Sequence, residues 1–116
     1  MRKVVIDKQI ATHVLNMRDR IVDAENSIGL TEDFGGVRAF EPSLSLDHAM
    51  EAATAIGLFE EGYALHYMKG TYTQVWAWQI SRVDDRGVLQ GFAHGETPAM
   101  AICNACLSKV GIVPGL

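Results

Sequence analysis

The sequence lacks the features that mark disulfide-rich, membrane-spanning and exported proteins. It has only two cysteines, Cys103 and Cys106, and both lie in one apolar stretch, so no disulfide framework is indicated. Every apolar run is shorter than the roughly 20 residues that span a bilayer. Only three apolar residues separate the basic pair Arg2-Lys3 from Asp7, too few for the apolar region of a signal peptide. We therefore expect a cytoplasmic protein without a membrane partner.

Basic residues are scarce in the middle of the chain. Residues 23–61 contain nine acidic side chains and one basic side chain, Arg38, and the whole chain has a formal net charge of −4. Proteins that bind nucleic acids cluster lysine and arginine to neutralise phosphates. We therefore expect no nucleic-acid partner, and we interpret the acidic segment as a solvated surface.

Catalytic motifs are missing as well. The chain has no G-x-S-x-G, P-loop or H-E-x-x-H pattern. Cys103-Asn104-Ala105-Cys106 has C-x-x-C spacing, but redox sites of that form begin a helix, where the dipole lowers the thiol pKa. Here the first cysteine lies about five residues inside an expected helix, where that effect has decayed. The sequence predicts two buried structural cysteines and no enzyme activity.

The histidines and cysteines do not predict a metal site. Zinc needs its ligands around one point. The expected strand register places His66 opposite Thr73 and His94 opposite Ala77, which separates the two histidines by roughly 13 Å along the sheet. We therefore expect neither a metal nor a cofactor.

The chain does contain enough apolar residues for one core. Of its 116 residues, 48% are hydrophobic, and no repeat or low-complexity tract divides it. A single domain over residues 1–116 is therefore expected. Residues 1–7 and 111–116 are predicted to be flexible ends.

Two helices are expected in the first half of the chain. The first begins near Ile10, because apolar side chains recur on one helix face as far as Ala24. Its end is left open, because Asn16 and the charges at residues 18–20 are alternative early ends. The second begins at Ser43 or Ser45 and ends near Ile56, before Gly57. The residues of the first apolar face are Ile10, Val14, Met17, Ile21 and Ala24, and those of the second are Leu46, Ala49, Met50, Ala53 and Ile56.

A third helix is expected over residues 98–109. Thr97 is a suitable N-cap, and Pro98 suits the first helical position, where a missing N–H has no cost. The helix is apolar nearly all round, which is typical of a buried helix. Helix N-termini attract phosphates, but Glu96 repels anions, so Thr97 is a weak phosphate-site candidate.

Between the second and third helices the chain predicts three antiparallel strands, over residues 62–68, 72–83 and 88–93. Residues 26–43 contain three glycines and are predicted to be a long loop. The expected register places Tyr67 opposite Tyr72, Leu65 opposite Gln74, Tyr63 opposite Trp76, Trp78 opposite Ala93 and Ile80 opposite Gly91.

The expected fold class is α+β, with one three-stranded antiparallel sheet and helices packed on it in the order α-α-β-β-β-α. Both faces of that sheet carry apolar side chains. Such a sheet needs covering on both faces. Either the helices are divided between the faces, or one face is buried against a second subunit.

Four aromatic residues are candidates for a ligand or interface surface. Trp76 and Trp78, with Tyr63 and Tyr72, lie on one face in the expected register. Stacked aromatic side chains on a sheet can bind bases or nucleotides. The same residues also suit a core or a subunit interface, so both interpretations stay open.

Three blocks of sequence resemble the phage ABA (alpha-beta-alpha) sandwich family. They are ATHVLNM at residues 11–17, FEPSLSLDHAME at residues 40–51 and ETPAMAICNACL at residues 96–107. The resemblance implies a small phage or prophage protein with a helix-sheet-helix sandwich. It implies no catalytic residues.

The expected element order is also that of a double-stranded RNA-binding domain. Such domains place lysines at the start of the last helix to contact phosphates. The corresponding residues, 96–104, contain no basic side chain, so this function is disfavoured.

The sequence therefore predicts a non-enzymatic phage or prophage accessory protein. It would act by binding a host protein, its own copies as a homo-oligomer, or a small ligand. The alternative is an anti-defence protein that sequesters a small nucleotide signal. The candidate binding residues are Tyr63, Tyr72, Trp76, Trp78 and Thr97.

Overall fold

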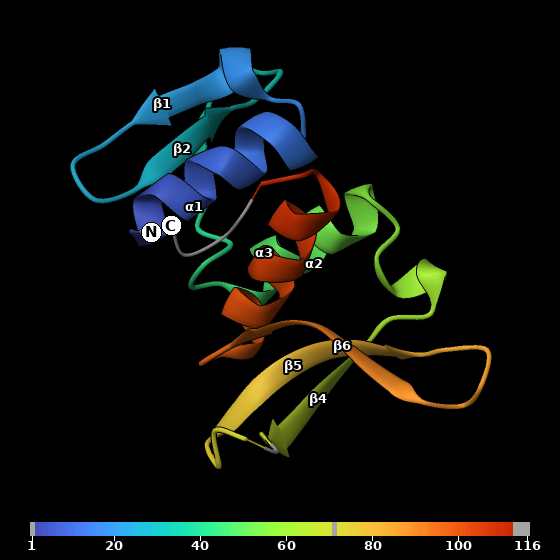
Figure 1. Ribbon diagram of the computed structural model, residues 1–116. Helices are drawn as coiled ribbons and strands as arrows, with labels where there is room; N and C mark the ends of the chain where they lie inside the picture. The colour runs from blue at the N-terminus through green and yellow to red at the C-terminus, as the bar shows by residue number, and fades with distance from the viewer. Residues whose placement is uncertain (1, 71, 113–116) are drawn as a thin grey trace.

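The computed structural model describes residues 2–70 and 72–112, and within them it confirms the expected α+β class. Helices α1, α2 and α3 accompany two three-stranded antiparallel sheets (Figure 1). The helices are α1 (Lys3–Gln9), α2 (Leu46–Ala55) and α3 (Pro98–Lys109). Sheet A contains β1 (Ile21–Asp23), β2 (Ile28–Thr31) and β3 (Val37–Ala39), and sheet B contains β4 (Ala64–Lys69), β5 (Trp76–Val83) and β6 (Leu89–Gly95).

The helices lie between the two sheets. Sheet A lies beside α1, and sheet B lies on the opposite side, beneath α3 (Figure 1). Helix α3 is the central element and packs on sheet B and on α2. Seven of its twelve residues are buried, as expected for a helix that is apolar all round. The expected three-stranded sheet with helices on it is therefore present as sheet B, and sheet A is an addition.

Helix α1 begins within the segment 1–7 that was predicted to be a flexible end, and Met1 lies outside the described residues. Helix α1 covers Lys3–Gln9 and continues as a π-helical turn over Ile10–Val14. Ile6 and Asp7 are buried.

The first helix ends near Asn16, the earlier of the ends that the sequence left open. Ile10 and Val14 are buried in the core, as the helical spacing predicted. Asn16 then adopts a left-handed conformation with φ of 56°, which ends the helix. Arg18–Arg20 form a short 3-10 turn, and Ile21 begins β1.

Residues 26–43 are not a loop, because they contain β2 and β3. Strand β2 pairs with β1 on one side and with β3 on the other. Ile28, Leu30 and Phe40 are buried. Strands of three or four residues carry little periodic signal, and the glycines around them favour a loop prediction.

Helix α2 confirms the second expected helix. The Ser45 hydroxyl caps it by accepting a hydrogen bond from the His48 backbone N–H at 3.3 Å. Its buried positions are Ala49, Ala52 and Ala53. Leu46 and Met50, which the spacing predicted to be core residues, are exposed.

The register of the β4–β5 hairpin differs from the prediction. Tyr67 lies opposite Trp78, and Lys69 lies opposite Trp76, so neither Tyr72 nor Tyr63 has the predicted partner. The connection is longer than a two-residue turn, because the Gly70 N–H donates to the Val75 carbonyl. The residues between Gly70 and Val75 therefore form the connection, and strand pairing resumes at Trp76.

The β5–β6 register is shifted by two residues from the prediction. Trp78 lies opposite Gly95, and Ile80 lies opposite Ala93. A β-bulge between Ile80 and Ser81 then pairs Ser81 with Gly91, so Phe92 is the extra residue. Before the bulge, the shift of two residues keeps Ala93 and Gly95 on their predicted face, whereas beyond it the shift is one residue and moves Leu89 and Gly91 to the opposite face.

At the other end of the chain, the Ile112 N–H donates to the Leu107 carbonyl at 2.9 Å, and Ile112 packs against the core. Gly111 and Ile112 therefore close α3, within the segment predicted to be a flexible end. The rest of the predicted flexible end, residues 113–116, lies outside the described residues. Within the described part of the chain, no helix has both the length and the apolar character needed to cross a membrane.

Candidate functional site

Three aromatic side chains form a continuous surface on sheet B. Tyr67 stacks on Trp76 with ring centroids 5.4 Å apart and contacts Trp78 at 5.0 Å. Alternation along β4 and β5 places all three on the face that carries α3. Tyr67 and Trp76 are 54% and 56% exposed, because α3 covers only part of that face. We call Tyr67, Trp76 and Trp78 the aromatic shelf.

Trp78 anchors the shelf to the core. It packs against the buried cluster and lies opposite Gly95. A Cβ at Gly95 would come within 2.5 Å of the Ala101 backbone nitrogen. Only glycine therefore allows the first turn of α3 to lie this close to the sheet, beside Trp78.

One basic side chain belongs to the same face. Lys69 lies opposite Trp76 in the β4–β5 ladder, and paired residues project from the same face of a sheet. The shelf thus offers two exposed aromatic rings on a face that also carries Lys69. Such a surface can stack on a planar group, pack against an apolar side chain, or attract an anion.

Trp76 and Trp78 are therefore brought together as predicted, but Tyr63 is not part of their surface. Tyr63 packs on Phe92 with centroids 5.0 Å apart. The guanidinium of Arg82 lies 4.8 Å from the centre of its ring, and the amine of Lys109 lies at 5.8 Å. These contacts use Tyr63 to join sheet B to the end of α3.

The two other predicted residues have separate surroundings. Tyr72 is 97% exposed in the β4–β5 connection. Thr97 caps α3, because its hydroxyl accepts a hydrogen bond from the Met100 N–H at 3.1 Å. That bond occupies the Met100 N–H, one of the helix amides that a phosphate would need.

Tyr67 is the shelf residue that the candidate list missed. Alternation already placed Tyr67 on the face of Trp76 and Trp78. The predicted two-residue turn, however, put it opposite Tyr72, away from both tryptophans. The longer connection between β4 and β5, which sets the register that pairs Tyr67 with Trp78, could not be read from the sequence.

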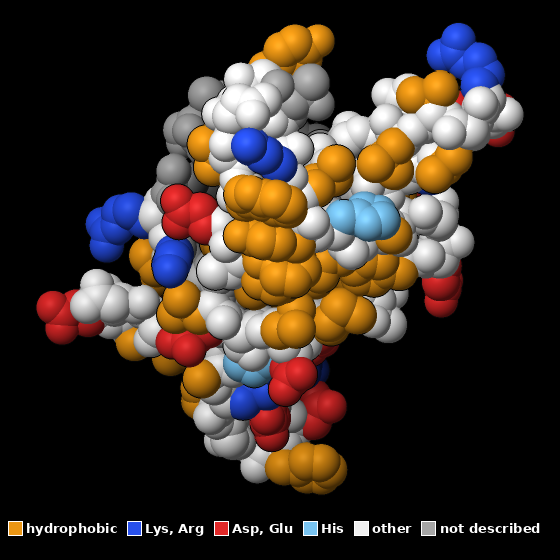
Figure 2. All heavy atoms as spheres, turned by 90° about the horizontal axis from the view of Figure 1, so that it is seen from below, with side chains coloured by type: hydrophobic (Ala, Val, Ile, Leu, Met, Phe, Trp, Pro, Cys, Tyr) orange, Lys and Arg blue, Asp and Glu red, His pale blue; other side chains and the backbone are white. Residues whose placement is uncertain are grey.

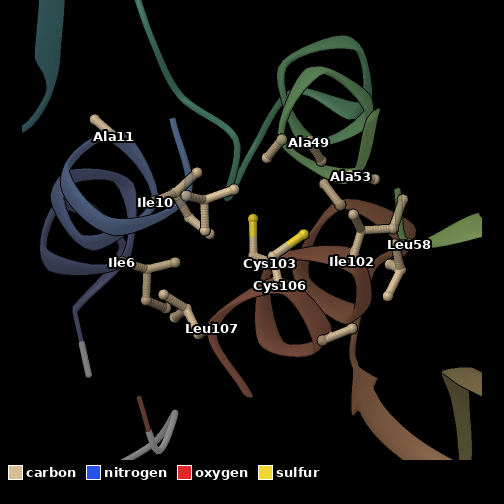
Figure 3. Close-up of a cluster of buried hydrophobic side chains, with 14 of the residues drawn as sticks. Ile6, Ile10, Ala11, Ala49, Ala53, Leu58, Ile102, Cys103, Cys106 and Leu107 are labelled. Carbon is tan, nitrogen blue, oxygen red and sulfur yellow. The ribbon is translucent and has the colours of Figure 1, made fainter. Parts of the chain in front are cut away.

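The two cysteines are buried and free, which confirms the structural interpretation. Figure 3 shows both sulfur atoms among apolar side chains of α1, α2 and α3. Burial raises the pKa of Cys106 to about 12 and raises that of Cys103 as well. Both thiols are therefore protonated at neutral pH, and neither can act as a thiolate nucleophile.

The histidines of sheet B are closer together than predicted. His66 and His94 both lie opposite Gln79, one on each side of the central strand. The predicted separation of four residues along the sheet was therefore wrong. The remaining distance is two strand spacings, about 10 Å between backbones. Within residues 2–70 and 72–112, no group of three or more histidine, cysteine or acidic side chains is placed to hold a metal.

A shallow hollow of about 250 Å³ lies on the face of sheet B that points away from α3. Met68, Ala77, Gln79 and His94 line it together with the β4–β5 connection. Small-molecule pockets usually measure about 300–1,000 Å³. The hollow is thus smaller than a typical ligand pocket, and sheet B presents mainly open surfaces.

Comparisons with known proteins add no relative. No protein-family model matches the chain, and no curated protein or solved structure matches it.

Proposed function

We propose that the chain is a non-enzymatic binding protein that contacts a partner protein through the aromatic shelf. The main support for this proposal is the stacked Tyr67–Trp76 pair. Both side chains are more than half exposed, although their neighbour Trp78 packs against the core. Tryptophan and tyrosine supply a large share of binding energy in protein interfaces. A rigid aromatic pair also loses little conformational entropy when it is covered.

The surroundings of the nucleophilic side chains support binding rather than catalysis. Both thiols are buried and protonated. The hydroxyls of Ser45 and Thr97 are engaged as helix caps. The Nδ1 atom of His48 accepts a hydrogen bond from the Glu41 N–H at 2.9 Å, so that nitrogen is not available as a base.

The genomic setting belongs to the same proposal. The three blocks at residues 11–17, 40–51 and 96–107 resemble the phage ABA sandwich family, and the partner would then be a bacterial host protein. The resemblance implies no binding residues, so only the geometry of the aromatic shelf supports it as the binding surface.

The test compares matched baits in bacterial lysate. Tagged wild-type chain, Tyr67→Ala, Trp76→Ala and the control Tyr72→Ala are used, and bound proteins are quantified by mass spectrometry. We expect a partner that the wild type and Tyr72→Ala retain and the two shelf variants lose. With the purified partner, Trp76→Ala should raise Kd about 30-fold, the loss of about 2 kcal/mol typical of a hot spot. Equal retention by all four baits would contradict the proposal.

A second candidate is a small nucleotide, favoured by the position of Lys69 opposite Trp76. A base would stack on Tyr67 or Trp76, and the amine would meet a phosphate. The chain has two tryptophans, and both belong to the shelf, so tryptophan fluorescence reports on this surface alone. Saturable quenching by a nucleotide, lost in Trp76→Phe and weakened in Lys69→Gln, would favour this candidate over a partner protein.

A further inference from the structure

Strand β4 is an edge strand of sheet B, and its outer edge has no neighbouring strand among the described residues. The strand order is β4-β5-β6, so β4 pairs with β5 on one side only, and it lies at the lower margin of the sheet in Figure 1. Within residues 2–70 and 72–112, no backbone hydrogen bond joins Ala64–Lys69 to a segment other than β5. A free edge of six residues is long enough to pair with a further strand.

The hydrogen-bond pattern shows which backbone groups β4 presents at this edge. In an antiparallel pair, residues that exchange hydrogen bonds alternate with residues whose N–H and C=O point away from the partner strand. The Gly70 N–H donates to the Val75 carbonyl, and the register continues from that pair into β4 and β5 without a shift. The backbone groups of Leu65, Tyr67 and Lys69 therefore point outward.

The other edges of the two sheets are blocked or short. At the edge of β6, the side-chain amide of Asn104 donates to the His94 carbonyl at 2.7 Å, and the bulge at Phe92 interrupts the strand. Strands β1 and β3, at the edges of sheet A, have three residues each. Covered groups, bulges and short strands all discourage pairing with another chain. Strand β4 is longer and regular, and its one lysine, Lys69, stands at its last position.

We propose that the edge of β4 binds an extended segment of a partner protein as an additional antiparallel strand of sheet B. Antiparallel addition continues the pattern of this sheet, and sheets are preferentially of one kind. Main-chain pairing to an exposed edge is a common mode of peptide recognition. The residue opposite Tyr67 would lie on the face of the aromatic shelf, beside the Tyr67 ring. The inference rests on the proposed function, because the added strand is the partner segment that would contact the shelf.

The side chains along the edge indicate the sequence that the added strand would have. Leu65 and Tyr67 favour β-branched residues opposite them. Lys69 favours an acidic residue at one end of the strand, and Glu60, exposed in the turn before β4, favours a basic residue at the other end. Figure 2 shows the sheet B side of the molecule, where hydrophobic side chains gather at the centre with charged side chains around them.

A synthetic peptide with this pattern, titrated into the isotope-labelled full chain, tests the proposal by NMR. The peptide has blocked ends and the sequence Glu-Thr-Val-Thr-Val-Thr-Lys. Its glutamate and its two valines would face Lys69, Tyr67 and Leu65 in that order. We expect saturable shifts of the amide signals of these three residues, with Kd below about 1 mM. Hydrogen exchange of the same amides should slow in the complex, because their N–H groups become bonded.

Two methylated peptides with the same side chains are matched controls for backbone pairing. Methylation of the nitrogen of the first valine removes an N–H that points toward β4 and should raise Kd at least about tenfold. The N–H of the next threonine points away from β4, so its methylation should change Kd less than about threefold. Exchanging the terminal glutamate and lysine should raise Kd about threefold, because like charges then meet.

The results separate strand addition from the proposed function of the shelf. Absence of amide shifts in β4 at millimolar peptide, or equal binding of the two methylated peptides, would overturn strand addition. A lysate partner lost by Trp76→Ala would still support the shelf in that case. Conversely, if Tyr67→Ala and Trp76→Ala bind the peptide as the wild type does, main-chain pairing at β4 stands and the shelf contributes nothing to it.

Discussion

At the residue scale, the buried carboxyl group of Asp7 connects helix α1 to the segment that precedes helix α2. Asp7 of α1 accepts a hydrogen bond from the backbone N–H of Ser43, just before α2, at 2.8 Å. Burial raises the pKa of Asp7, and the hydrogen bonds from Ser43 oppose that shift only in part. The carboxyl group is therefore more easily protonated in the folded chain than in the unfolded chain.

The raised pKa fixes the sign of a pH dependence. Because the folded state holds this proton more tightly, the contribution of Asp7 to stability is greatest at low pH and falls as pH rises from about 4 through the folded pKa. Asp7→Asn keeps an acceptor for Ser43 but has no charge. We predict that the stability of Asp7→Asn relative to wild type increases with pH over this range.

Urea unfolding of both proteins between pH 4 and pH 7 measures this difference. Asp7→Ala is the control, because it leaves the Ser43 N–H without its acceptor and should cost about 1–3 kcal/mol. A relative stability of Asp7→Asn that decreases as pH rises would show that the ionised carboxylate is favoured in the folded state.

At the scale of elements, the contact of α3 with sheet B depends on one glycine. Gly95 ends β6, and α3 begins three residues later at Pro98. The neighbours of a Cβ at Gly95 are backbone atoms and the Cβ of Met100, all within 2.9 Å. These atoms cannot rotate away, so α3 would have to shift from the sheet.

A matched pair of glycine substitutions tests this contact. We predict that Gly95→Ala destabilises the fold by about 1–3 kcal/mol, the usual cost of overpacking. Gly91→Ala meets only the end of the flexible Gln79 side chain and should cost less than about 1 kcal/mol. Chemical denaturation of the two variants measures both costs. Equal losses would mean that the α3–sheet contact can relax.

At the scale of the whole molecule, the two sheets share one core. Ile28 and Leu30 of sheet A and Ile80 of sheet B belong to the same buried cluster as the helices. Both tryptophans of the chain lie in sheet B, so their fluorescence reports on the unfolding of that sheet. Because the core is shared, a substitution that destabilises sheet A should also lower the stability that tryptophan fluorescence detects in sheet B.

We predict that Leu30→Ala lowers the stability detected by tryptophan fluorescence by about 2–5 kcal/mol, the usual cost of a buried leucine. The fluorescence and circular dichroism transitions should coincide, as in two-state unfolding. Val37→Ala, an exposed position in the same sheet, should change stability by less than about 0.5 kcal/mol. A fluorescence transition unchanged by Leu30→Ala would mean that the sheets unfold separately.

Local patterns alone determined the α+β class, helix α3 with its Thr97 cap, helix α2 and the three strands of sheet B. Helix spacing, capping residues and alternation act over a few residues, so they can be read from sequence. The same alternation placed Trp76 and Trp78 on one face, and the burial of the cysteines followed from their place in an apolar helix.

Only the tertiary structure decided how these elements meet. Sheet A, the buried Asp7, the length of the β4–β5 connection and the bulge beside Ile80 all depend on contacts between distant segments. Those contacts set the register that joins Tyr67 to the two tryptophans and aligns His66, Gln79 and His94. Register depends on turn length and on bulges, which a short pattern of alternating residues does not specify. For this reason the sequence predicted which aromatic residues share a face of the sheet. The tertiary structure determined which of them contact one another and form the aromatic shelf.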